Sequence, residues 1–319
     1  MFLRKTLAPA AAGIVLLAAA LALAPAAPCA AQEVVQDEGA AYRAWHDASQ
    51  AGDNAKAMAA ANAYLEKYPT GQYADFLKKW LGTAQMTALD AAIKGKNMAE
   101  MIKVGREILA SDPENLNVLY ALAFNLRLNE LMAQKFEHAS DAREFSQKAV
   151  SLVEAGKTLA GVATFNKNVT LAWLYQALAI IEGSSGKPAE AVKLYEKSSG
   201  LAPDDVPIKG RNLLNVIALR QGSYAEVAKA YNALPEADRA AAEPKPEVKA
   251  AREALNTEAD ALIDAAASFV AFGKAKNLPA ATVDRVNQML ETVYKGRFPE
   301  DTTLDGLKKI LAGKGAPQA

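Results

Sequence analysis

The sequence has little of the material from which metal and redox sites are built. Its 319 residues include one cysteine, Cys29, and two histidines, His46 and His138. Zinc, haem and iron–sulfur centres draw most of their ligands from these two residue types. We therefore expect no metal site and no cofactor. Both histidines stand among polar residues at helical positions, so each is expected to be exposed to solvent rather than to act as a catalytic base.

An excess of charge of one sign is also lacking. The 36 lysine and arginine residues equal the 36 aspartate and glutamate residues, which gives a formal net charge of zero. Nucleic-acid binding depends on clustered positive charge, so we expect no nucleic-acid partner. Runs of β-branched residues of strand length are nearly absent, whereas alanine, the strongest helix former, is abundant. This composition predicts an all-α fold.

Enzyme motifs are missing as well. The sequence has no Gly-x-Ser-x-Gly elbow, no His-Glu-x-x-His helix and no Gly-x-Gly-x-x-Gly turn. Gly156, Lys157 and Thr158 match the end of a phosphate-binding loop, but Ser151 stands where that motif requires its first glycine. We predict no catalytic residue and expect that the protein is not an enzyme.

The N-terminal segment has the order of parts found in secretory signals. Arg4 and Lys5 precede an apolar run at 13–24, and small residues follow up to Ala31. Residues 1–31 are therefore predicted to be a signal peptide cleaved before Gln32. Two alternatives stay open, an uncleaved membrane anchor and a lipidated Cys29. We expect contact with a membrane only if Cys29 is lipidated.

A helix–turn–helix unit is clearest at 171–204. Its first helix carries apolar residues at helical spacing, namely Leu171, Leu174, Leu178 and Ile181. Gly186 permits the turn that follows, since glycine tolerates a left-handed backbone. Ala191 and Tyr195 lie on the inner face of a second helix, which ends before Pro203. The pattern predicts two helices that pack against each other.

This unit resembles a tetratricopeptide repeat. Leu178 and Ala179 match the large–small pair of the first helix, Ala191 the small residue at the helix crossing, and Pro203 the terminal proline. The sequence departs from the pattern in two places, with Tyr175 in place of tryptophan and Glu182 in place of an aromatic residue. The resemblance covers about residues 42–234 and implies an array of such units.

Weaker copies of the unit lie on both sides. Gly222 begins a segment that repeats the one from Gly186 at an offset of 36, and 206–220 would be its first helix. Upstream, two glycines are each followed by a helical segment and a proline, in the pairs Gly52 and Pro69, and Gly95 and Pro113. We expect a turn at each of these glycines, Gly222 included.

Residues 64–74 carry a narrower resemblance. The stretch from Tyr64 to Ala74 contains Tyr68 and Pro69 followed by Tyr73, and it is similar to the linker in tetratricopeptide proteins of the bacterial cell envelope, including outer-membrane assembly lipoproteins. This similarity and the signal peptide imply an exported protein, periplasmic or associated with the envelope.

The remaining segments complete the predicted organisation. A helix at 140–154 is expected to open with a capping box of Asp141 and Glu144, and an irregular loop follows at 156–168. Helices at 248–272, 280–294 and 304–311 are expected to cap the last repeat. The prediction is therefore an all-α chain with a signal peptide at 1–31, a TPR-like α-solenoid of antiparallel helix pairs at 32–242, and a C-terminal helical cap at 243–319.

The predicted function follows from this architecture. Stacked repeats form a concave groove lined by their first helices, in which tetratricopeptide proteins commonly hold peptides. The groove positions in this register are Asn117, Tyr120, Trp173, Gln176, Lys209 and Asn212. We expect a non-enzymatic scaffold that binds a protein or peptide partner of the cell envelope. The alternatives are a structural lipoprotein tethered through Cys29, and a helical small-molecule binder or enzyme with its pocket between the array and the C-terminal helices.

Overall fold

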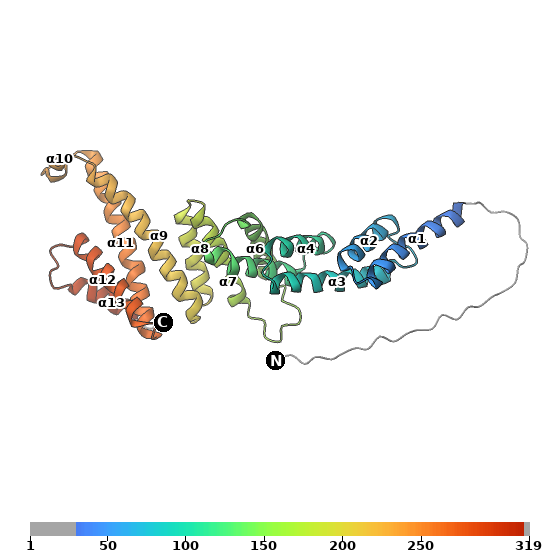
Figure 1. The fold of residues 1–319 in the computed structure, drawn as a ribbon. Coiled ribbons are helices and arrows are strands. Elements are labelled where there is room, and N and C mark those ends of the chain that lie inside the picture. Colours follow the sequence, from blue (N-terminus) through green and yellow to red (C-terminus); the bar gives the residue numbers. More distant parts are fainter. Residues whose placement is uncertain (1–29, 316–319) are drawn as a thin grey trace, which may run out of the picture. The chain divides into compact units, whose positions relative to one another are not determined.

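The computed structural model describes residues 30–315, and all regular structure in that range is helical (Figure 1). The all-α prediction is confirmed for this part of the chain. Nearly all of the predicted signal peptide, including Cys29, lies outside the described residues. The helices are α1 (Ala30–Gln50), α2 (Asn54–Lys67), α3 (Ala74–Lys94), α4 (Met98–Ser111), α5 (Leu116–Asn129), the 3-10 turn η1 (Leu131–Ala133), α6 (Ala139–Glu154), α7 (Lys167–Ser184), α8 (Pro188–Leu201), α9 (Val206–Asn232), α10 (Glu236–Ala240), α11 (Pro246–Ala275), α12 (Ala280–Arg297) and α13 (Asp305–Gly315).

The chain forms two compact units that divide between Leu81 and Gly82, within α3. In the first unit, α1 packs against α2. Small residues at the contact, Ala57 and Ala61, are fully buried and let the two helices approach closely. The hydroxyl group of buried Tyr64 donates a hydrogen bond to Glu38 of α1 and accepts one from the backbone N–H of Tyr73 at 3.0 Å. These bonds tie the segment after α2 to the first helix.

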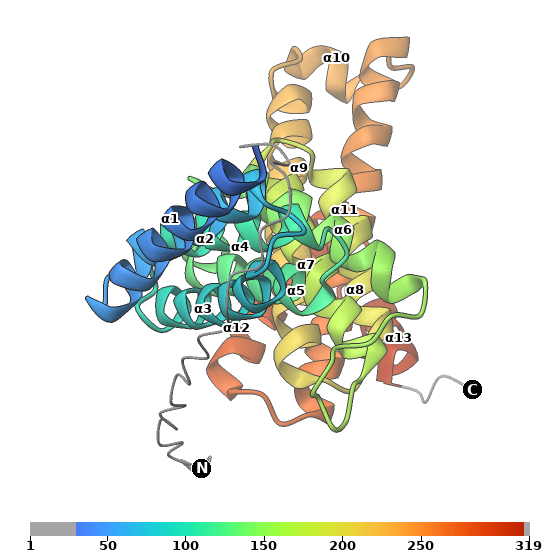
Figure 2. The same ribbon diagram turned by 90° about the vertical axis from the view of Figure 1, so that its right-hand side faces the viewer.

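In the second unit, helices adjacent in the sequence pack against each other from α4 to α9, and α9 then packs on α11. Alternate helices also touch, α5 with α7 and α7 with α9. Long helices α9 and α11 lie side by side and run in opposite directions, and α12 and α13 cover α11 (Figures 1 and 2). Apolar side chains such as Leu122, Phe145 and Phe269 fill the interior between these layers.

The turns between paired helices match the sequence at three places. Helices α2, α4 and α8 each lie between a glycine and a proline, as the repeat pattern predicts. Gly52 and Gly186 adopt φ angles of 71° and 75°, the left-handed conformation that glycine allows at low cost. In the turn at Gly95 the left-handed residue is Lys96, with φ of 52°.

The expected turn at Gly222 is wrong. Helix α9 continues through this glycine without a break, from Val206 to Asn232. A glycine inside a helix costs only about 1 kcal/mol relative to alanine, which packing can offset. Leu219, before Gly222, and Tyr224, after it, pack into the same apolar cluster as residues of α11. The second half of α9 therefore extends the pairing with α11 instead of folding back on the first half.

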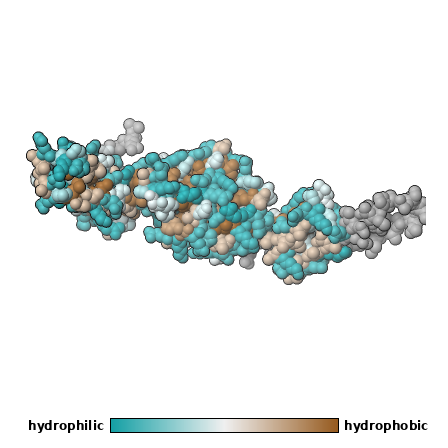
Figure 3. All heavy atoms as spheres, turned by 90° about the horizontal axis from the view of Figure 1, so that it is seen from above, coloured by the Kyte–Doolittle hydropathy of each residue, from teal (hydrophilic) through white to brown (hydrophobic). Residues whose placement is uncertain are grey.

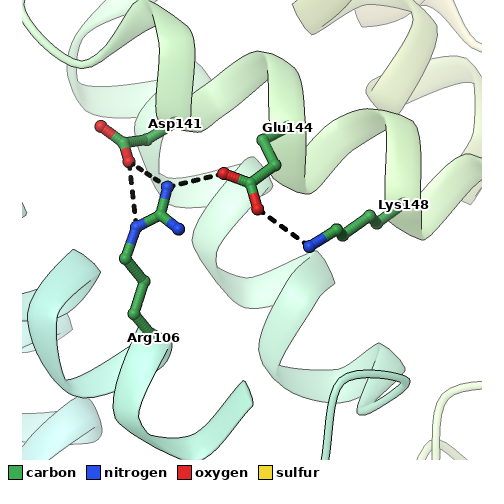
Figure 4. Close-up of polar contacts among 4 residues, drawn as sticks. All are labelled: Arg106, Asp141, Glu144 and Lys148. Atoms are coloured by element: carbon green, nitrogen blue, oxygen red, sulfur yellow. Dashed lines mark hydrogen bonds and ion pairs between the residues drawn. The ribbon is translucent and has the colours of Figure 1, made fainter. Parts of the chain in front are cut away.

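The capping box predicted for α6 is also wrong. This helix begins at Ala139, and no side chain caps its first turn. Arg106 of α4 instead draws both acids across the helix contact, with Nη2 2.6 Å from Asp141 Oδ1 and 2.6 Å from Glu144 Oε2 (Figure 4). Lys148 bonds the second oxygen of Glu144 at 2.9 Å. Hydrogen bonds between charged partners are stronger than those to a neutral backbone N–H, so the acids turn toward the guanidinium group.

Other predicted elements agree with the structure to within a few residues. The loop expected at 156–168 is irregular up to Asn166, which caps α7 by accepting from the N–H of Val169 at 3.1 Å. Helices α11 and α12 contain the first two predicted C-terminal helices, and α13 overlaps the third from Asp305 on.

The surface of the described residues is mixed. On the face drawn in Figure 3, apolar side chains form islands among hydrophilic ones rather than one continuous band. None of the described helices combines the length with the hydropathy that a membrane span requires.

Candidate functional site

A chain of buried polar side chains crosses α5, α7 and α9. Arg127 Nη1 donates to Gln176 Oε1 at 2.6 Å, and Gln176 Nε2 donates to Asn212 Oδ1 at 2.6 Å. Asn212 Nδ2 continues to Ser198 Oγ at 2.8 Å. Gln176 and Asn212 have no exposed surface and Arg127 is 2 % exposed. We call Arg127, Gln176 and Asn212 the amide ladder.

This ladder corrects the prediction for Gln176 and Asn212. Both were expected to face an open groove and to bind a peptide backbone, but their amide groups are buried and bonded to other side chains. The reason is that α7 packs against both α5 and α9, so these two side chains lie between helices instead of meeting solvent. Breaking such bonds would leave buried polar groups unpaired.

Three half-buried aromatic rings lie beside the ladder. Tyr120 and Phe124, one turn apart on α5, stack with ring centroids 5.7 Å apart, and Phe124 meets Trp173 of α7 edge-to-face at 6.2 Å. The guanidinium group of Arg127 lies 4.0 Å from the centroid of Trp173, a cation–π contact. We call Tyr120, Phe124 and Trp173 the aromatic row. Two of its members, Tyr120 and Trp173, are predicted groove residues, and each of the three rings is partly exposed.

Arg127 is held in this place at some electrostatic cost. Burial lowers the pKa of its guanidinium group to about 10, and the positive charge of nearby Arg211 acts in the same direction. No carboxylate in the described part of the chain pairs with it. The rings of the aromatic row and the amide of Gln176 take over the stabilisation that an acid would otherwise provide.

Asn117 of α5 bonds the backbone of the loop before α7. Its Nδ2 donates to the carbonyl oxygen of Ala160 at 3.0 Å, and its Oδ1 accepts from the N–H of Ala160 at 2.9 Å. Both bonds are made to one residue of the irregular loop before α7. The side-chain amide of the predicted groove residue Asn117 is therefore bonded to a segment of this chain.

Lys209 contacts the C-terminal helices. Its ammonium group is 5.2 Å from the ring centroid of Phe272 on α11, and the side chain is half-buried. The structure thus gathers Tyr120 and Trp173 on one surface, places Asn117 against a loop, buries Gln176 and Asn212, and pairs Lys209 with the C-terminal helices.

A metal could be held at one place among residues 37–315. Glu130, Glu137 and His138 each offer one ligand atom within 4.8 Å of the others. Glu130 is 7 % exposed, and its Oε1 lies 2.8 Å from His138 Nδ1. The prediction that His138 is a solvated residue is therefore wrong, because it packs beside a buried carboxylate. This histidine–carboxylate contact accounts for both residues without an ion.

A pocket of about 830 Å³ opens among α7, α9, α11, the start of α12 and the η1 turn. Most of its lining is apolar, including Ile180, Leu214 and Phe269. It lies between helices predicted to form the array and helices predicted to form the C-terminal cap. No acid or histidine is among the residues described as lining it, whereas Tyr195 and Arg211 are.

Sequence reasoning missed Phe124 and Arg127. Phe124 follows Tyr120 by four residues, so helical periodicity alone places both rings on one face of the helix. That spacing could have added Phe124 to the predicted groove residues. Arg127 gave a weaker signal, a charged residue near the end of an otherwise apolar helix. Its partners come from α7, and their proximity is a tertiary property.

No protein-family model matches this chain, and neither the curated proteins nor the solved structures give a match. The site is therefore judged from its own geometry.

Proposed function

We propose that this chain is a non-enzymatic scaffold of tetratricopeptide type that binds a protein or peptide partner along the face of α5 and α7. The observation that carries the proposal is the aromatic row of Tyr120, Phe124 and Trp173, half-exposed and held in place by the amide ladder beneath it. Aromatic side chains supply large apolar contact area with little loss of conformational entropy, and they dominate many interfaces.

Stacking of equivalent positions supports the repeat architecture. Gln176 and Asn212 are 36 residues apart, the same offset as the sequence repeat, and they are joined directly at 2.6 Å. Residues at one position of successive first helices touch in this way when the units stack side by side. The helix pair α7 and α8, between Gly186 and Pro203, is the most regular unit.

The contact at Asn117 supports a peptide backbone as part of what this face binds. Its side-chain amide bonds both the N–H and the C=O of Ala160, so an amide here can pair with both backbone groups of one residue. A partner segment would meet the aromatic row with its apolar side chains. Binding needs no cofactor, and the described residues of this face hold no pair of acids placed for catalysis.

Site-specific photocrosslinking tests this proposal. A photoreactive residue at Tyr120 in the full chain, expressed in its host, should capture a defined partner. The same residue at Ala254, exposed on α11, should not. With the purified partner, Phe124→Ala is expected to weaken binding about tenfold or more, because truncating an aromatic residue at the centre of an interface costs about 2 kcal/mol or more and each ~1.4 kcal/mol is about tenfold. Equal capture at both positions, or unchanged affinity, would reject the aromatic row as the binding surface.

We also propose that the protein is exported and acts in the bacterial cell envelope. The support is the order of charge, apolar run and small residues before Gln32. Mass spectrometry of the mature N-terminus separates the alternatives. A chain that begins at Gln32 supports a soluble exported scaffold, whereas a diacylglyceryl group on Cys29 supports a tethered lipoprotein, and an intact Met1 contradicts both.

A further inference from the structure

The apolar pocket in the second unit has one charged residue in its lining. Arg211 lies on α9, is exposed to solvent, and lines the pocket together with apolar residues that include Leu214, Leu278 and Phe269. Among the described residues, no carboxylate forms an ion pair with its guanidinium group. Glu182, on the neighbouring helix α7, is by contrast paired with Arg143 and Lys187. The charge of Arg211 is therefore available to a ligand.

The pocket also offers neutral hydrogen-bonding groups near this charge. Asn215 lies one helical turn after Arg211 on α9, so both side chains project from the same side of the helix. Asn215 Nδ2 donates to the hydroxyl oxygen of Tyr195 at 3.0 Å. Tyr195 is 4 % exposed and lines the pocket, and burial raises its pKa to about 12, so the hydroxyl group keeps its proton. That proton has no acceptor in the part of the chain that is described.

Size and shape favour a small molecule over a protein segment. The volume of about 830 Å³ falls within the range typical of small-molecule sites, about 300–1,000 Å³. Gly210 adds to the space, since it leaves the face of α9 beside Arg211 without a side chain. Arg211 is the one cation among the residues described as lining the pocket, which matches a ligand with one negative charge.

We propose that this pocket binds an amphipathic monoanion, a small molecule with an apolar ring or chain and one carboxylate or sulfonate group that pairs with Arg211. The apolar body fills the space between α7, α9 and α11, and the acidic group accepts hydrogen bonds from Arg211. This inference is independent of partner binding at the aromatic row.

Two fluorescent probes that differ in charge test the pairing in the mature full-length chain. The probes are 1-anilinonaphthalene-8-sulfonate and its uncharged analogue N-phenyl-1-naphthylamine. Arg211→Gln is expected to weaken binding of the sulfonate by about tenfold or more, the size of a charge-assisted hydrogen bond, and to leave the uncharged probe unchanged. Arg211→Lys should retain most of the preference for the sulfonate. Arg43→Gln, at an exposed arginine of α1, is the matched control and should change neither.

A second variant tests the location. Ala218 lines the pocket and is exposed, so Ala218→Trp should fill the space without disturbing the core and should weaken binding of both probes. Dodecanoate should displace the sulfonate probe more effectively than dodecanol does. The proposal is overturned if Arg211→Gln leaves sulfonate binding unchanged, if it weakens both probes equally, or if Ala218→Trp affects neither.

Discussion

Two glycines 36 residues apart are expected to respond to the same substitution with opposite sign. Gly186 sits in the turn between α7 and α8 with φ of 75°, whereas Gly222 lies inside helix α9. A Cβ atom added at either position meets no heavy atom within 4 Å. Steric contact is therefore absent from both, and the backbone conformation alone decides the effect.

The magnitudes follow from that conformation. An alanine in the left-handed region costs about 1–2 kcal/mol, and the loss of unfolded-state entropy returns part of this. Gly186→Ala should then lower the free energy of unfolding by about 1 kcal/mol. In a helix interior alanine is favoured over glycine by about 0.5–1 kcal/mol, so Gly222→Ala should raise the free energy of unfolding by that amount. The two variants should differ by about 2 kcal/mol.

Urea unfolding followed by tryptophan fluorescence measures this difference. Replacing Trp45 and Trp80 with phenylalanine leaves Trp173 as the sole tryptophan, so the signal reports on the second unit alone. If Gly222→Ala destabilises the unit as much as Gly186→Ala does, then α9 turns at Gly222. In that case the hairpin expected from the sequence repeat is right and the continuous helix is wrong.

Two further substitutions test contacts between helices. Asn212→Ala should lower the free energy of unfolding by about 2–4 kcal/mol because it leaves buried donors unpaired, whereas Gln221→Ala, exposed on the same helix, should change it by less than about 0.5 kcal/mol in urea unfolding. Arg106→Gln should cost less than about 1 kcal/mol because the bridge is partly exposed. Hydrogen bonds from Lys148 and Arg106 lower the pKa of Glu144, so this contribution is present above the usual carboxyl pKa and disappears as the pH falls through the lowered value. Comparing the variant with the parent near neutral pH and again in acid measures it, and a difference that persists or grows in acid would contradict the assignment.

Local signals in the sequence predicted the elements of this fold well. Asp53 and Asp205 cap α2 and α9 by accepting N–H bonds at 3.0 Å and 2.9 Å, as short polar residues before an apolar run are expected to do. Glycine and proline bracket α2, α4 and α8 for similarly local reasons. Such rules depend on a few neighbouring residues, so one sequence is enough to apply them.

Gly222 and Asp141 show where local signals fail. In each case the sequence fits a known pattern, a repeat turn or a capping box, and a distant element decides otherwise. Packing against α11 keeps α9 straight through Gly222, and the guanidinium group of Arg106 turns Asp141 away from the N–H groups of its own helix. In both cases the local pattern, a turn at glycine or a cap at the helix start, is worth only about 1 kcal/mol. The tertiary contacts that replace it are worth as much or more.

The amide ladder explains why the candidate site was only half-predictable. A repeat register gives the angular position of a residue on its helix but not whether a neighbouring helix covers it. Tyr120 and Trp173 lie where the helices leave part of each ring exposed, whereas Gln176 and Asn212 lie at the same contact one layer deeper. Amides at such a position restrict how two helices stack, because a shift of one helix would break the bond between Gln176 and Asn212. If the aromatic row binds a partner, the ladder acts indirectly, by holding the rings at a fixed spacing. Ladder variants that still fold should then lose affinity only to the extent that Trp173 changes its surroundings, which its fluorescence reports directly.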